Sequence, residues 1–72
     1  MTEPRFLTIA EVAGILVVNE STVRGLIKRG DLRAFQIGGR GIWRIGRDDL
    51  EAYITDAYRR TAERIAAGEF PD

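Results

Sequence analysis

The chain has 72 residues, equal numbers of basic and acidic side chains, and neither cysteine nor histidine. A chain of this length forms one domain and buries roughly 60% of its unfolded surface. Without Cys or His, disulfides, zinc sites built on these residues, and thiol or imidazole catalysis are excluded. No apolar run approaches the roughly 18 residues of a membrane span, and residues 1–5 are too polar for a signal peptide. We therefore expect a cytoplasmic protein without metal, cofactor or membrane partner.

Charge is distributed unevenly along the chain. Through Arg47, eight basic residues outnumber four acidic ones, whereas from Asp48 onward seven acidic residues outnumber three arginines. Such asymmetry indicates one surface for a polyanion and another for solvent or a protein partner. The alternative is chance scatter over a mixed-charge surface.

The first half of the chain carries the signals of two short helices. Thr8 and Glu11 form a capping box ahead of an apolar stripe with helical spacing, which predicts a first helix ending near Leu16. After a break at residues 17–19, Asn19 is a favoured N-cap for a second helix over residues 20–29. Gly30 suits the left-handed position that closes this helix. Two helices separated by so short a turn are typical of a helix-turn-helix.

The second half is predicted to contain a β-hairpin and a long helix. Residues 32–37 and 42–45 read as strands around residues 38–41, where three glycines mark a tight turn. A final helix runs from Arg47 to Ala67, after Gly46 as its N-cap, and is ended by Gly68 and Pro71. The fold class is mainly α with a small β-hairpin, a winged helix-turn-helix. We expect one domain over residues 1–72, with a core of about 6–58 and a helix extension and tail over 59–72.

The outer face of the predicted second helix is polar or basic, opposite a core side of Val23, Leu26 and Ile27. Hydroxyl, guanidinium and ammonium groups there can reach phosphates and base edges in the major groove, and a glycine lets the backbone approach a phosphate. The candidate DNA-binding residues on this helix are Ser21, Thr22, Arg24, Gly25, Lys28 and Arg29. Glu20 either accepts a hydrogen bond from a cytosine amino group or serves only the helix dipole. An ordinary solvated helix face is the alternative for the whole set.

The hairpin supplies a second set of candidate DNA-binding residues. Gly39 and Arg40 form its tip, and Arg33 and Arg44 lie on or beside its strands. An arginine on a thin loop can enter a minor groove and read its width through the electrostatic potential. The alternative is an exposed turn arginine without a partner. Trp43 is predicted to be a core residue, with a stacking role as the alternative.

Catalysis has little support in the sequence. Asp48, Asp49 and Glu51 are explained as acids at the start of a helix. The glycines of residues 38–41 join two strands, whereas a nucleotide-binding loop joins a strand to a helix. We expect no catalytic residue and no enzymatic activity.

The apolar spacing of the final helix continues past the length that its own core can cover. Such a stripe folds back, frays or meets another chain. Because this half is acidic, a protein partner is favoured over DNA, most simply a second copy. Tyr58 and Ile65 are the predicted self-association residues, and the alternative is that Tyr58 packs on its own domain.

The chain resembles the excisionase-like and MerR-like winged-helix DNA-binding domains of bacteria and their phages. The resemblance is carried by LTIAEVAGIL (residues 7–16), STVRGLIKRGDLRAFQIGGRGIWRI (21–45) and DDLEAYI (48–54). It implies a DNA-binding helix over 20–29, a wing over 38–41 and head-to-tail assembly on DNA. Actinobacterial chromosomal proteins and phage excisionases are the nearest kinds. Two departures stand out: Val17 replaces a glycine at the end of the first helix, and Gly25 replaces a basic or aromatic residue.

The predicted function is sequence-specific binding of double-stranded DNA by a small, nucleoid-associated transcriptional regulator. A recombination directionality factor, which bends DNA for an integrase partner, is the alternative within the same class. A protein-interaction module that uses the acidic C-terminal helix is the alternative from another class.

Overall fold

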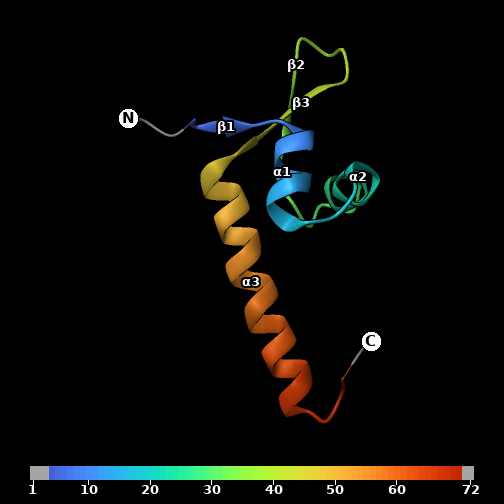
Figure 1. The fold of residues 1–72 in the computed structure, drawn as a ribbon, viewed down its shortest axis with the longest axis vertical. Coiled ribbons are helices and arrows are strands. Elements are labelled where there is room, and N and C mark those ends of the chain that lie inside the picture. Colours follow the sequence, from blue (N-terminus) through green and yellow to red (C-terminus); the bar gives the residue numbers. More distant parts are fainter. Residues whose placement is uncertain (1–3, 71–72) are drawn as a thin grey trace.

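The computed structural model describes residues 4–70, and its elements follow one another as β1-α1-α2-β2-β3-α3 (Figure 1). Helix α1 (Ile9–Leu16) begins with the predicted capping box, in which the Thr8 hydroxyl accepts from Glu11 N and the Glu11 carboxylate accepts from Thr8 N. Helix α2 (Glu20–Lys28) begins after Asn19, whose side chain accepts from the backbone N–H of Thr22 at 2.9 Å. Both predicted helix starts are therefore confirmed.

The turn between α1 and α2 depends on a left-handed valine. Val17 has φ 58° and ψ 51°, and it is the only non-glycine residue with positive φ among those described. Its side chain is 86% exposed, so no packing compensates for the unfavourable backbone conformation. The chain thus keeps the turn that a glycine would form while carrying a β-branched residue in it.

The end of α2 explains why the predicted first strand is too long. Gly30 takes φ 81°, as expected for the residue that closes the helix. The N–H groups of Asp31 and Leu32 then both donate to the carbonyl of Leu26. Leu32 is only 1% exposed and belongs to the helix end and the core. Strand β2 consequently spans Phe35–Ile37, and the prediction of a strand from residue 32 is wrong.

The sheet has three strands, one more than the sequence predicted. Strand β3 (Ile42–Gly46) pairs antiparallel with β2 on one side and with β1 (Phe6–Leu7) on the other. The N–H of Arg47 donates to the carbonyl of Arg5 at 2.9 Å and extends the second pairing. The additional strand is β1, at residues 6 and 7. A two-residue strand has too little alternation to be recognised without its partner.

Alternation along the strands separates a core face from an outer face. Leu7 and Ile45 are paired and buried, at 4% and 0% exposure. They join α1, α2 and the start of α3 in one core, whose buried members are Leu7, Ile9, Val12, Ala13, Val23, Leu26, Leu32, Ile45 and Leu50. The opposite face carries four large apolar side chains that are each less than half exposed: Phe6, Phe35, Ile37 and Ile42.

Helix α3 (Arg47–Ala66) starts in the core and then leaves it. Gly46 is its N-cap, Asp48 and Asp49 lie in its first turn, and Gly68 takes φ 88° beyond its last residues, as predicted. Leu50 is its one buried residue among those described. Twenty residues span about 30 Å, and Figure 1 shows the far half of α3 extending away from the other elements. The predicted stop at Pro71 lies outside the described residues.

Candidate nucleic-acid interface

The outer face of α2, which carries the candidate DNA-binding residues, is exposed as the sequence predicts. Val23 and Leu26 are buried against the core, at 0% and 8% exposure. Gly25 is half-buried. The other candidates on this helix are exposed to solvent: Ser21, Thr22, Arg24, Lys28 and Arg29. A Cβ built on Gly25 would meet no atom within 4 Å, so this position is a gap in the surface of the helix.

The two hydroxyls at the start of α2 are held by its N-cap. Ser21 Oγ and Thr22 Oγ1 each donate to Asn19 Oδ1 at 2.8 Å. Their protons are thereby engaged, and their oxygens remain available as acceptors. In this arrangement the hydroxyls fit a donor such as a base amino group better than a phosphate oxygen.

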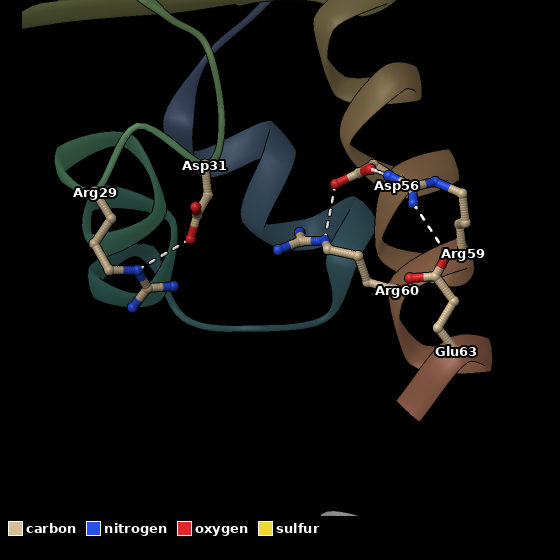
Figure 2. Close-up of polar contacts among 6 residues, drawn as sticks. All are labelled: Arg29, Asp31, Asp56, Arg59, Arg60 and Glu63. Carbon is tan, nitrogen blue, oxygen red and sulfur yellow. Dashed lines mark hydrogen bonds and ion pairs between the residues drawn. The ribbon is translucent and has the colours of Figure 1, made fainter. Parts of the chain in front are cut away.

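Of the six basic candidates, three have an ionic partner among the described residues and three have none. Arg24 Nη2 lies 3.8 Å from Glu20 Oε1, and Arg33 Nη1 lies 4.0 Å from Asp49 Oδ1. Arg29 Nε donates to Asp31 at 3.1 Å, which holds this side chain at the end of α2 (Figure 2). Among the described residues, Lys28, Arg40 and Arg44 have no ionic partner. Because Arg44 donates a hydrogen bond to a backbone carbonyl, Lys28 and Arg40 are the cations most available to a polyanion.

The wing consists of β2, β3 and the turn at residues 38–41. Gly38, Gly39 and Gly41 all have positive φ, between 66° and 75°, so glycine is required by the tight turn that exposes Arg40. Arg44 is partly buried, and its Nη1 donates to the carbonyl of Trp43 at 2.8 Å. Arg44 is therefore held against the strand, whereas Arg40 extends from the tip.

A hollow of about 240 Å³ lies between α2 and β3. Ile9, Ile27 and Trp43 form its apolar lining, and Arg24 and Lys28 complete it. Trp43 packs against the core cluster, which confirms the prediction that it is a core residue. Its side chain is partly buried and also borders this hollow. Sequence reasoning missed the hollow because its walls come from helices and a strand that are distant in the chain.

The predicted self-association residues lie far from this interface. Tyr58 is 77% and Ile65 is 50% exposed on the far half of α3, so Tyr58 does not pack on its own core. Figure 1 shows the hairpin tip and the end of α3 at opposite ends of the molecule. The structure therefore places most candidate DNA-binding residues on α2 and at the wing tip. It sets apart Arg33, beside Asp49 at the start of α3, and Arg44, on the outer face of the sheet. Tyr58 and Ile65 lie away from all of these.

Two arginines of α3, Arg59 and Arg60, are paired with acidic residues of the same helix. Asp56 binds both Arg59 and Arg60, the latter at 2.8 Å, and Glu63 binds Arg59 at 3.3 Å (Figure 2). The hydrogen bond that Arg59 donates to Asp56 and the charges of both acids raise the pKa of the exposed Arg59 guanidinium above its ordinary value. These cations are already neutralised locally, which disfavours this helix as a DNA-binding surface.

Residues 4–70 contain neither a metal-binding cluster nor a membrane-spanning helix. No group of three or more acidic side chains that could hold a metal ion occurs in this part of the chain. No helix there is long and apolar enough to cross a membrane.

Comparison with known proteins supports the helix-turn-helix assignment. A family model described as a helix-turn-helix domain matches residues 6–58. The chain is also 42% identical over 71 residues to the uncharacterized protein YvgK of Bacillus subtilis (strain 168). That alignment covers 99% of this chain and 22% of the relative, so the chain spans about a fifth of the length of the relative.

Proposed function

The chain belongs to the helix-turn-helix domain family, and from that premise we propose that it is a sequence-specific, double-stranded DNA-binding protein and not an enzyme. Helix α2 would read the major groove, and Arg40 on the wing would enter the adjacent minor groove. The observation that carries the proposal is that Lys28 on α2 and Arg40 at the wing tip are both exposed and have no ionic partner among the described residues. Lys28 also shares a hollow with Trp43 on β3 of the wing.

Transcriptional regulation is the role we propose for this binding. A recombination directionality factor would use the same surface, and an integrase gene beside the coding sequence would favour that alternative. Either role would bring the protein to the nucleoid. A protein-interaction module would show no salt-dependent binding to duplex DNA. Because the chain spans about a fifth of its relative, these roles concern this domain and not the whole of a longer protein.

The direct test is the double variant Arg24→Ala/Lys28→Ala. Each lost phosphate contact should reduce the slope of log affinity against log salt by roughly one unit, and overall duplex affinity should fall. The matched control is Arg59→Ala/Arg60→Ala, which removes the same charge from α3 and should leave affinity nearly unchanged. Unaltered binding by an Arg24→Ala/Lys28→Ala variant with native circular dichroism would contradict the assignment.

Self-association through α3 is the second part of the proposal. Ile54, Tyr58, Thr61 and Ile65 follow one another at spacings of four, three and four residues, which is the spacing of a coiled-coil seam. Tyr58 and Ile65 are exposed, and the charged residues around Asp56 are paired within the helix. We propose that a second copy covers this stripe, weakly in solution and more strongly when neighbouring copies are bound on DNA.

A further inference from the structure

Glu20 is the one acidic residue on the recognition helix, and its place there is unfavourable for binding DNA in general. A carboxylate on a DNA-facing surface repels phosphates and lowers the affinity for any duplex. The neighbouring side chains on the exposed sides of α2 are hydroxyl or basic groups. If α2 enters the major groove, Glu20 must contribute something other than affinity.

The geometry joins Glu20 to Arg24. Glu20 Oε1 lies 3.8 Å from Arg24 Nη2, one helical turn further along, and both side chains are 54% exposed. An ion pair this exposed contributes little to stability. Arg24 also lines the hollow together with Trp43 and Lys28, so the arginine of this pair lies on the side of α2 that faces β3.

The two side chains together match one base pair. In the major groove guanine presents two acceptors, O6 and N7, which a guanidinium contacts, and cytosine presents an N4 amino group, which a carboxylate accepts from. These groups lie side by side on the edge of a single G·C pair. A guanidinium and a carboxylate whose nearest atoms lie 3.8 Å apart can reach both bases from one place on the helix.

We propose that Glu20 is a specificity-determining residue, which together with Arg24 reads one G·C base pair in the major groove. Arg24 donates to the guanine, and Glu20 accepts from the paired cytosine. This inference rests on the proposed DNA-binding function and adds the identity of one base pair to it. It also gives a reason for a carboxylate on a DNA-facing helix. Glu20 lowers the affinity for every other sequence and so favours the one base pair that it contacts.

The test uses the full chain and duplex DNA with a randomised central segment. Sites are selected by the wild type, Glu20→Gln and Arg24→Ala, and the preferred duplex is then titrated with its single base-pair variants. We expect the wild type to require G·C at one position. Both variants should lose about tenfold in preference at that same position, and Glu20→Gln should bind random duplex more tightly than the wild type.

Glu51→Gln is the matched control, because it removes one exposed carboxylate from α3 and should leave every base preference unchanged. An unchanged preference in Glu20→Gln would overturn the inference and leave the proposed function standing, with Glu20 serving only the helix dipole. Losses at different base pairs in the two variants would also overturn it. Failure of the wild type to bind any duplex would instead refute the proposed function.

Discussion

The rings of Phe6 and Phe35 meet edge to face on the outer side of the sheet, with centroids 5.3 Å apart and planes at 78°. The two residues belong to the two edge strands, which do not pair with each other. Phe6 lies opposite Gly46 on the central strand, and Phe35 lies opposite Arg44. The aromatic contact therefore links β1 to the wing across β3 and adds to the backbone pairing of a strand only two residues long.

This contact should be measurable as a coupling between the two phenylalanines. Phe6→Leu and Phe35→Leu keep apolar side chains but remove the ring pair, whose geometry contributes about 0.5–1.5 kcal/mol beyond burial. Denaturant unfolding of both single variants and the double variant should give a coupling of at least about 0.5 kcal/mol. The control cycle combines Phe6→Leu with Ile37→Val at the far end of β2, where effects should add.

Val17→Gly should stabilise the protein. The left-handed conformation costs a non-glycine residue about 1–2 kcal/mol, whereas the added freedom of glycine in the unfolded chain costs about 0.4–1 kcal/mol. The difference should raise the melting temperature by about 2–5 °C. Val18→Gly is the control, since Val18 is not among the residues with positive φ, and it should melt lower than the wild type. A lower melting temperature for Val17→Gly would show that Val17 stabilises the turn by other means.

Arg40→Ala should weaken DNA binding without affecting the fold, because Arg40 has no ionic partner in the described part of the chain and lies in an exposed turn. The loss should be several-fold on sites with a narrow A/T-rich minor groove beside the major-groove contact, and smaller on G·C-rich flanks. Arg40→Lys should recover part of the affinity, since it keeps the charge but not the planar guanidinium. Equal affinity of wild type and Arg40→Ala on both flanks would reduce the wing to a structural element.

Tyr58→Ala and Ile65→Asp should abolish association between copies of the chain while leaving the domain folded. Both side chains are exposed and lie beyond the core, so their replacement should cost little stability. Sedimentation should show less dimer at high concentration, and titration of DNA with adjacent sites should lose cooperativity. Glu63→Ala, on a different side of α3, is the control. Unchanged cooperativity in both folded variants would refute the α3 interface.

Part of the candidate site could be predicted from the sequence, and the rest depends on the fold. The exposed faces of α2 and the wing follow from periodicity, and those assignments agree with the exposure of Lys28 and Arg40. Periodicity does not show which cation is engaged by an acid. The i, i+4 spacing of Glu20 and Arg24 could have indicated their contact, whereas the approach of Arg33 to Asp49 brings together a loop and a helix sixteen positions apart.

The amino-acid sequence by itself determined the helix ends and the tight turn of the wing. The capping box at Thr8, the Asn19 cap and the closing Gly30 act through groups three to six residues apart, so their outcome depends little on the rest of the chain. Only the tertiary structure decided that residues 6 and 7 form a strand and that Leu32 belongs to the core. A two-residue strand forms only because it pairs with β3. Leu32 is buried because segments distant in the sequence pack together around it. Such pairings are selected by burial of the whole core, which local propensity does not encode.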